Sequence, residues 1–261
     1  MRTTTQTTEG RYMFDQRRDD ERERLTSMEL LWDRGTRTVI ESLGIGPGWR
    51  CLEIGAGAGS IARWLAGRVQ PNGQLLATDI STLHLDGLAE PNLEVREHDI
   101  LRDPLPGDHF DLVHARLVVA HLGRRALERA ASAVRPGGWL VLEDLDWGAA
   151  LSHPENERYR RITDGINRFL SHAGYDACFG RRLVHELECA GLRNVAADGR
   201  MRVYRGGTVT TTFMRLSIES MSAGVRESGE LTAEDVEWAL AALDDPDSVF
   251  LTPIIAAWGR K

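Results

Sequence analysis

A short apolar run that ends in a glycine-rich turn constrains this chain of 261 residues more than any other feature. Residues 51–54, Cys-Leu-Glu-Ile, lead into Gly-Ala-Gly-Ala-Gly at 55–59, and residues 61–66 then show the apolar spacing of a helix. A strand, a glycine turn and a helix in this order build the ligand pocket at the carboxyl edge of an open α/β sheet. Glycine at such a turn adopts torsions that a Cβ would forbid.

The spacing of these glycines distinguishes the turn from two common nucleotide-binding patterns. A dinucleotide fingerprint is Gly-x-Gly-x-x-Gly, whereas here Gly59 comes one residue early and Ser60 takes its place. A phosphate-binding loop ends in Gly-Lys-Ser or Gly-Lys-Thr, and this stretch contains no lysine. The turn therefore either belongs to a third kind of ligand-binding site or binds no ligand.

The turn opens a regular alternation of predicted strands and helices. Strands are expected over residues 74–80, 93–97, 110–115 and 139–144, with a helix over 122–134 and a turn at 135–138. Such alternation favours a mostly parallel sheet with right-handed crossovers. After residue 146 the rhythm changes, and we predict helices over 153–170, 181–190, 208–223 and 232–243 and strands over 195–204 and 249–258. One or two amphipathic helices are expected over residues 12–43.

Composition limits the classes of partner. The formal net charge is -7, and a nucleic-acid surface needs clustered positive charge, so we predict no nucleic-acid partner. Cys51, Cys178 and Cys189 are too few for a disulfide framework and lack metal-ligand spacing, which indicates a cytoplasmic protein without a metal site. No apolar run has the length of a membrane span or a secretory signal, so no membrane partner is expected.

Several motifs, in their order along the chain, resemble those of one enzyme family. The pattern Glu-x-Gly-x-Gly-x-Gly at residues 53–59 resembles the first motif of class I S-adenosylmethionine-dependent methyltransferases. The acid Asp79, the triplet His-Asp-Ile at 98–100, and segments 110–122 and 135–140 fall where that family has its later motifs. The branch they resemble most is that of bacterial small-molecule and quinone-biosynthesis methyltransferases. The resemblance covers residues 49–146 well and the rest of the chain loosely.

Together with the alternation of elements, the resemblance implies the fold and its division. We expect an α/β fold with a Rossmann-like, seven-stranded, mostly parallel sheet, helices on both faces and helical cap insertions. Residues 1–45 would form an N-terminal helical segment that acts as a lid, and residues 46–146 the core that binds S-adenosylmethionine. Residues 147–261 would complete the sheet and cap the acceptor. Helices that only pack and contact no ligand are the alternative for segments 147–175 and 205–246.

The resemblance also implies which residues hold the cofactor S-adenosylmethionine. They are Tyr12, Glu53, Gly55, Ala56 and Gly57 for the methionine part, Asp79 and Ile80 for the ribose, Asp99 and Ile100 for adenine, and Ala115 and Arg116 beside the sulfonium. The residues themselves leave alternatives open. Asp79 suits the two ribose hydroxyls or the N-cap of a helix near Ser81, and Asp99 suits the adenine amine or a solvated loop.

The expected reaction is an in-line displacement that moves a methyl group to an oxygen, nitrogen or carbon atom of a small organic acceptor. Holding the partners in line is worth effective molarities of about 10⁵–10⁸ M and should outweigh a general base, worth about 10²–10⁴-fold. His121 is the first candidate for a base, because it follows the fourth strand and an imidazole titrates near neutral pH. His114 and Asp144 are further catalytic candidates, and a structural role is the alternative for each.

Other functions stay open beside this one. A nucleic-acid or protein methyltransferase is opposed by the acidic charge and by the lack of an Asn/Asp-Pro-Pro-Tyr/Phe motif after the fourth strand. A nicotinamide-dependent oxidoreductase would need a proton donor such as a Tyr-x-x-x-Lys pair, but Lys261 stands at the end of the chain. Only an assay separates a non-catalytic S-adenosylmethionine-binding protein from an enzyme. Apolar positions in the N-terminal helices would suit a homodimer.

Overall fold

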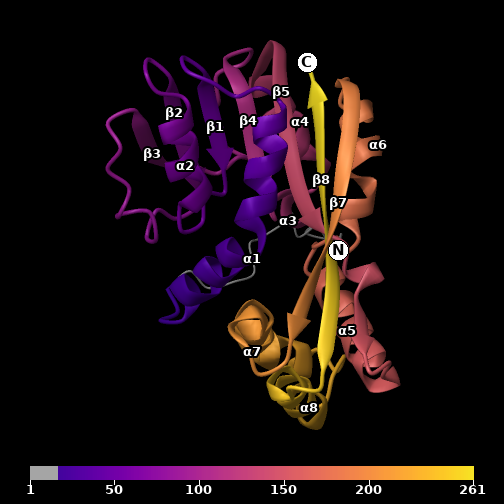
Figure 1. Ribbon diagram of the computed structural model, residues 1–261. Coiled ribbons are helices and arrows are strands. Elements are labelled where there is room, and N and C mark those ends of the chain that lie inside the picture. Colours follow the sequence, from indigo (N-terminus) through magenta and orange to yellow (C-terminus); the bar gives the residue numbers. More distant parts are fainter. Residues whose placement is uncertain (1–16) are drawn as a thin grey trace, which may run out of the picture.

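The computed structural model describes residues 17–261, so the proposed contact of Tyr12 lies outside the described residues. The elements are shown in Figure 1. In chain order they are α1 (Glu21–Ser42), β1 (Arg50–Ile54), α2 (Ser60–Arg68), β2 (Gln74–Asp79), β3 (Leu93–Glu97), β4 (Phe110–Arg116), α3 (Val119–Leu122), α4 (Arg124–Ala133), β5 (Val134–Leu145), β6 (Leu151–His153), α5 (Glu157–His172), α6 (Leu183–Cys189), β7 (Arg193–Arg205), α7 (Thr212–Glu227), α8 (Ala233–Asp244) and β8 (Val249–Arg260).

One sheet organises these elements. Its strands follow the order β3-β2-β1-β4-β5-β8-β6, and β7 also pairs with β8. Strands β3, β2, β1, β4 and β5 are parallel, whereas β8 is antiparallel to β5, β6 and β7. The predicted α/β class with a mostly parallel sheet is confirmed. The sheet has eight strands, because the three-residue strand β6 adds to the seven that the sequence predicts.

The central strands are buried on both faces, which is why they have nearly continuous apolar sequences. Neighbouring residues of a strand point to opposite faces. Cys51 and Leu112 pack with apolar side chains of α1 and α2, and Leu52 and Val113 pack with those of α4 and α6. Helices therefore cover both faces of the sheet, and the carboxyl ends of β1, β2, β3 and β4 meet at one edge.

Several predicted boundaries differ from the observed ones. The helix predicted over 122–134 is observed as α4, and a separate short helix, α3, precedes it, because the chain turns at Gly123 with φ of 72°. The turn predicted at 135–138 lies inside β5, where the pairing with β4 shifts between Phe110 and Leu112. The helix predicted over 181–190 begins at Leu183, after a 3-10 turn. In each case an irregular backbone occupies a place where composition alone suggests a single element.

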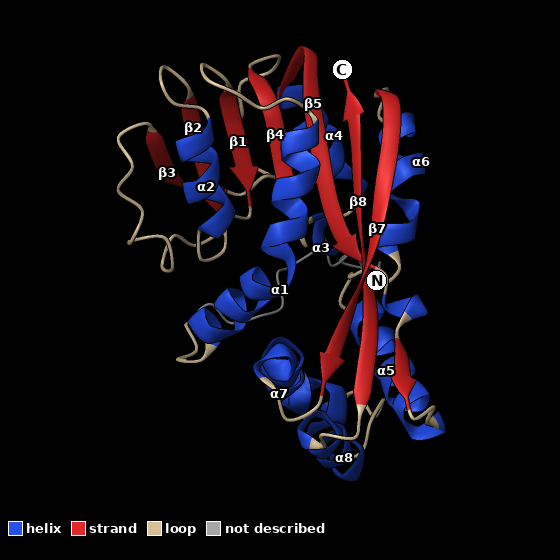
Figure 2. Ribbon diagram, in the orientation of Figure 1, coloured by secondary structure: helices blue, strands red, loops and turns tan. Residues whose placement is uncertain are grey.

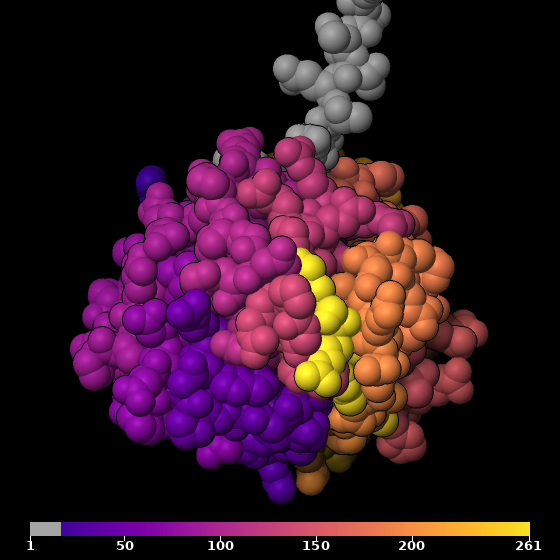
Figure 3. Space-filling model, turned by 90° about the horizontal axis from the view of Figure 1, so that it is seen from above, coloured from indigo at the N-terminus to yellow at the C-terminus, as the bar shows by residue number. Residues whose placement is uncertain are grey.

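Strands β7 and β8 carry the sheet beyond the ends of the parallel strands. They contain 13 and 12 residues and reach a group of three helices, α5, α7 and α8 (Figure 2). When the molecule is seen from above relative to Figure 1, the C-terminal end of β8 lies between the segments that contain β5 and β7 (Figure 3). Helix α1 contacts both α2 and α7. The three-helix group and α1 thus stand at the carboxyl edge of the sheet.

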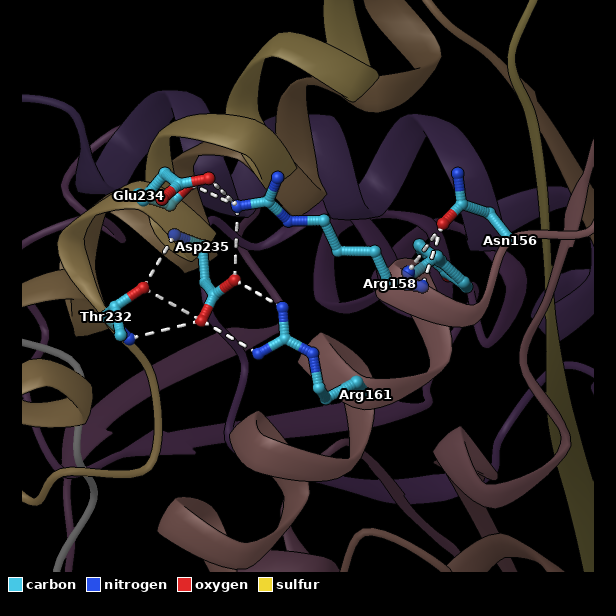
Figure 4. A network of polar contacts seen from close by, with 7 residues as sticks. Asn156, Arg158, Arg161, Thr232, Glu234 and Asp235 are labelled. Atoms are coloured by element: carbon cyan, nitrogen blue, oxygen red, sulfur yellow. Dashed lines mark hydrogen bonds and ion pairs between the residues drawn. The ribbon is translucent and has the colours of Figure 1, made fainter.

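An ion-pair network joins the first turns of α5 and α8 (Figure 4). The carboxylate of Asp235 accepts two hydrogen bonds from Arg161, at 2.7 and 3.1 Å, and one from Arg158 at 3.3 Å. Thr232 is the N-cap of α8 and forms a capping box with Asp235. Asn156 caps α5 by accepting from two backbone N–H groups. Two helix starts are therefore fixed to each other by side chains that also satisfy their own ends.

Candidate functional site

Glycine shapes the turn between β1 and α2. Gly55, Gly57 and Gly59 have φ of 70°, 60° and 90°, in the left-handed region where a side chain is strained. A Cβ on Gly55 would also lie 2.4 Å from Cγ2 of Val118. The turn therefore packs closely against the segment that follows β4, and its backbone is left open toward the carboxyl edge of the sheet.

Asp79, at the end of β2, holds this turn in place. Its Oδ2 accepts a hydrogen bond from the backbone N–H of Gly57 at 3.0 Å, and its Oδ1 accepts one from Ser81 at 3.2 Å. Burial raises the pKa of Asp79, and the N–H donors of Gly57 and Ser81 oppose that rise. The alternative role as a helix N-cap is wrong, because turns and not a helix connect β2 to β3. The carboxylate also lines a large cavity.

That cavity has a volume of about 1660 Å³ and lies between the carboxyl edge of the sheet and the three-helix group. Seven of the residues predicted to hold the cofactor line it: Gly55, Gly57, Asp79, Ile80, Asp99, Ile100 and Arg116. His121 lines it as well. On the far side the lining comes from α5, α7, α8 and the segment after β5. Residues that are distant in sequence therefore line the same cavity.

The end of β3 supplies Asp99 and Ile100 to the cavity wall. The Oδ1 of Asp99 accepts from the backbone N–H of Leu101 at 2.8 Å, and its Oδ2 lies 3.4 Å from Nε of Arg102. Ile100 is 4% exposed and packs into the core. Ile80, which lines the same cavity, is 49% exposed, although it is a large apolar side chain. A carboxylate with apolar neighbours is thus present where the resemblance implies adenine.

The C-terminal end of β4 contacts α1. Arg116 donates to the hydroxyl of Thr36 at 2.9 Å and to Asp33 at 3.0 Å, both on α1. The next residue, Leu117, has φ of 57°, a strained conformation for leucine. Its N–H donates to the carbonyl of Glu143 at 2.8 Å, which holds it there. Arg116 therefore anchors α1 over the cavity, in addition to lining the wall where the resemblance implies the sulfonium.

Two predicted residues, Glu53 and His114, form a buried charge cluster beside the cavity and do not line it. Nδ1 of His114 lies 2.7 Å from Oε2 of Glu53, and its Nε2 lies 3.6 Å from Oε1 of Glu143. Arg200 of β7 binds the other oxygen of Glu143. Burial lowers the pKa of His114, but the carboxylates of Glu53 and Glu143 outweigh it and raise that pKa to about 9. His114 is therefore a charged core residue without contact to an acceptor.

The remaining catalytic candidates, Asp144 and His121, differ in their access to the cavity. Asp144 is fully buried, accepts from the backbone N–H of Ala120 at 3.1 Å and does not line the cavity. Burial raises its pKa well above the usual range. His121 faces the cavity, and its ring centroid lies 4.6 Å from that of Tyr175. Burial and, to a lesser extent, the positive charge of Arg24 lower the pKa of His121 to about 4, so its imidazole is neutral at pH 7.

Ala56 contributes to the site through a backbone hydrogen bond, and Ala115 contributes through packing in the core. Ala56 donates its N–H to the carbonyl of Thr78 at 3.0 Å, which fixes the glycine turn to β2. Ala115 is 2% exposed and belongs to the core on the α4 side. Neither side chain lines the cavity. The short side chains leave room for the turn and for the residues after β4.

Glu29 of α1 is a site residue that the sequence did not reveal. Its Oε1 accepts from the backbone N–H of Ser60 at 3.0 Å, and so it satisfies a free N–H at the start of α2. Burial raises its pKa, whereas the Ser60 bond lowers it. The contact joins residues far apart in the chain, and an exposed-looking acid in a charged helix gives no local sign of it.

Two further findings concern other kinds of site. Within residues 17–261, no group of three or more His, Cys, Asp or Glu side chains is placed to hold a metal ion. None of the helices in that part of the chain is both long enough and apolar enough to cross a bilayer.

Comparison with known families agrees with this geometry. Residues 51–138 match the family model described as a methyltransferase domain. The match extends from β1 into β5 and includes the glycine turn and the ends of β2, β3 and β4. Within this matched segment the glycine turn lies at the edge of the cavity, as the resemblance of the motifs implies.

The chain is similar to named methyltransferases, about half of whose length it spans. "Methyltransferase str2" of Strobilurus tenacellus is 33% identical over 146 residues, or 54% of this chain and 52% of the relative. The ubiquinone/menaquinone biosynthesis C-methyltransferase UbiE of Ectopseudomonas mendocina is 31% identical over 147 residues, or 52% of this chain and 54% of the relative. A phosphoethanolamine N-methyltransferase 2 structure from Haemonchus contortus has a TM-score of 0.56 at 14% identity, covering 91% of this chain and 57% of that one. The structural likeness concerns the fold.

Proposed function

We propose that this chain is an enzyme that transfers a methyl group from S-adenosylmethionine to a small organic acceptor. The observation that carries the proposal is that the Gly57 turn, Asp79 and His121 line one cavity. A cofactor held at the carboxyl edge of the sheet and an acceptor held under the helices would meet there. The printed names of the relatives support the same class of reaction.

The residues at the sheet edge fit S-adenosylmethionine. The turn has no Cβ at Gly55 and Gly57, so a ligand can approach its backbone, and Asp79 and Asp99 offer carboxylate oxygens for ribose hydroxyls and an adenine amine. When bound, S-adenosylmethionine supplies a methyl group that its sulfonium makes electrophilic. The Haemonchus neighbour was solved with S-adenosylhomocysteine, which supports this assignment. Glu53 would act indirectly, by holding the turn from beneath.

We assign the acceptor to the side of the cavity formed by residues 147–261, where α5, α7 and α8 provide the wall. Helix α1 would act as the lid of the predicted N-terminal segment, since Arg116 and the Ser60 N–H both bind its acidic residues Asp33 and Glu29. Tyr12 stays a prediction for the methionine part of the cofactor.

The main role of these residues is to orient the cofactor and the acceptor. His121 is the proposed proton acceptor. A hydroxyl acceptor must lose a proton, and His121 is a cavity-lining histidine that is neutral at pH 7. Its lowered pKa makes it a weak base, so we place its contribution near the low end of the usual range of about 10²–10⁴-fold. His114 and Asp144 have no path to an acceptor and are not assigned to catalysis.

The proposed function is tested by incubating the protein with S-adenosylmethionine that carries a labelled methyl group and an extract of small metabolites. Mass spectrometry should then detect products heavier by one labelled methyl. Label that appears only in protein or RNA would contradict a small-molecule acceptor. Saturable cofactor binding without any labelled product from a broad extract would favour a non-catalytic binding protein.

For His121→Ala we expect turnover to fall about 10²-fold while the dissociation constant for S-adenosylhomocysteine stays unchanged. Because only neutral imidazole accepts a proton, wild-type turnover should be flat from pH 6 to 8 and should fall only near the pKa of about 4. His185→Ala, on the exposed surface of α6, is the matched control. Unchanged turnover in His121→Ala would remove this residue from the mechanism.

A further inference from the structure

We propose that the acceptor is an uncharged, elongated apolar molecule that lies between α5, α7 and α8. This inference rests on the proposed function and names the substrate class of the same cavity. Three properties of the acceptor wall carry it: the space available, the distribution of charge, and the kind of side chain that lines it.

The cavity is larger than one ligand of ordinary size requires. Its volume of about 1660 Å³ exceeds the roughly 300–1,000 Å³ that is usual for a small-molecule site. A cofactor at the glycine turn would occupy the sheet edge, and the remaining space extends toward the start of β8, where Phe250 forms part of the wall. A molecule of a few atoms would leave most of this space to water against apolar surface.

Charge divides the cavity into two parts. All of its Asp, Glu and Arg lining residues lie between Arg17 and Arg116. The lining contributed by described residues from 122 onward contains none of these and no Lys or His. A charged acceptor would lose its water there and gain no partner of opposite charge, which is unfavourable. This part of the cavity therefore disfavours an ionised carboxylate, phosphate or ammonium.

One cation beside the acceptor wall is already paired with a carboxylate. The guanidinium of Arg24 lies 5.8 Å from the ring centroid of Phe213 on α7. Its Nε and Nη2 each donate to the Glu21 carboxylate at 2.8 Å. This bidentate pair satisfies both charges within α1, so Arg24 presents little net charge for an anionic acceptor.

The acceptor wall itself combines aliphatic, aromatic and thioether side chains. Ile166 of α5, Ile218 and Met221 of α7, and Phe250 of β8 face the hollow. Thioethers adapt to irregular apolar ligands. Asn167 is an uncharged polar residue on the same wall, and its amide can both donate and accept one hydrogen bond. The wall thus suits a long apolar body with a hydroxyl or carbonyl group.

Binding of 4-alkylphenols with chains from propyl to dodecyl tests this inference by calorimetry in the presence of S-adenosylhomocysteine. Each added methylene should tighten binding about fourfold, which corresponds to about 0.8 kcal/mol, until the space is filled. The 4-alkylbenzoates of equal length should bind at least about tenfold more weakly, because their carboxylate has no partner. Affinity that does not depend on chain length, or equal affinity for the benzoates, would overturn the inference.

Met221→Gln places an amide of similar length in the acceptor wall. We expect it to weaken dodecylphenol binding about tenfold, or about 1.4 kcal/mol, with S-adenosylhomocysteine binding unchanged. Met201→Gln is the control, since Met201 is 49% exposed on β7 and does not line the cavity. If S-adenosylhomocysteine binds but no alkylphenol does, the acceptor class is wrong while the proposed function stands. If S-adenosylhomocysteine itself does not bind, the proposed function fails.

Discussion

His114 shows how a single buried side chain can hold a site together without touching its ligand. It is completely buried between the carboxylates of Glu53 and Glu143, on three neighbouring strands β1, β4 and β5. Arg200 completes the cluster, and a Cβ on Gly35 of α1 would collide with its guanidinium at 1.7 Å. The cluster therefore fixes the strand ends beneath the glycine turn and depends on a glycine in the helix above.

His114→Gln should destabilise the protein strongly, by about 3–5 kcal/mol, because it leaves buried carboxylates without their cation. The folded-state pKa of His114 is raised from 6.5 to about 9. Its stabilising contribution is therefore fully present below pH 6.5 and is lost as the pH rises through 9. Urea unfolding at pH 6.5 and pH 9 measures this change.

His109→Gln, at the start of β4, serves as the control for this substitution. Wild-type protein should lose stability between pH 6.5 and 9, His109→Gln should follow it, and His114→Gln should lose less over the same interval. Equal pH dependence in wild type and His114→Gln would show that His114 is not the charged partner of these carboxylates.

At the scale of elements, the starts of α5 and α8 are fixed to each other by polar side chains, beside the apolar cluster that Ile162 and Val236 form between these helices. Asp235 is almost completely buried at the start of α8, and hydrogen bonds from Arg161 hold its pKa well below the usual range. Because that pKa is depressed, the contribution to stability is present above pH 3.8 and is lost as the pH falls further. The position of α8 beside α5 depends on this carboxylate.

Thr232→Ala removes one half of the capping box and should cost about 1 kcal/mol, within a usual range of about 0.5–2 kcal/mol. Urea unfolding monitored by circular dichroism measures the loss. Thr38→Ala, at an exposed position inside α1, should change stability little or raise it slightly, since alanine is the better helix former. A Thr232→Ala variant as stable as wild type would mean that the cap contributes nothing to the helix.

Local sequence predicts the elements better than their contacts. Buried parallel strands such as β2 (Gln74–Asp79) appear as short apolar runs between turns, and the capping box at Thr232 is readable from four consecutive residues. Strand β6 was missed because its three residues are stabilised only by pairing with β8, far along the chain. Glu29 and the partners of His114 were missed for the same reason: their roles arise from long-range contacts. Candidate residues at strand ends could be named, but which of them reach the cavity could not.

At the scale of the whole molecule, the long strands β7 and β8 connect the parallel part of the sheet to the three-helix group (Figure 2). The cavity lies between these two parts. The expected homodimer stays a prediction. Most apolar side chains of α1, including Leu25, Leu31 and Trp32, are buried within the chain, whereas Leu30 is 60% exposed. Little apolar surface of α1 is therefore left for a second copy.

Isothermal titration calorimetry with S-adenosylhomocysteine and with NADH tests most directly whether the glycine turn and Asp79 form a cofactor site. We expect saturable heat with S-adenosylhomocysteine and none with NADH. Asp79→Ala should weaken the binding about 10–100-fold, as expected for loss of hydrogen bonds to a charged group, about 1.5–3 kcal/mol. Asp86→Ala, on the exposed surface, should leave it unchanged. Saturation by NADH with no heat from S-adenosylhomocysteine would contradict the assignment of this site.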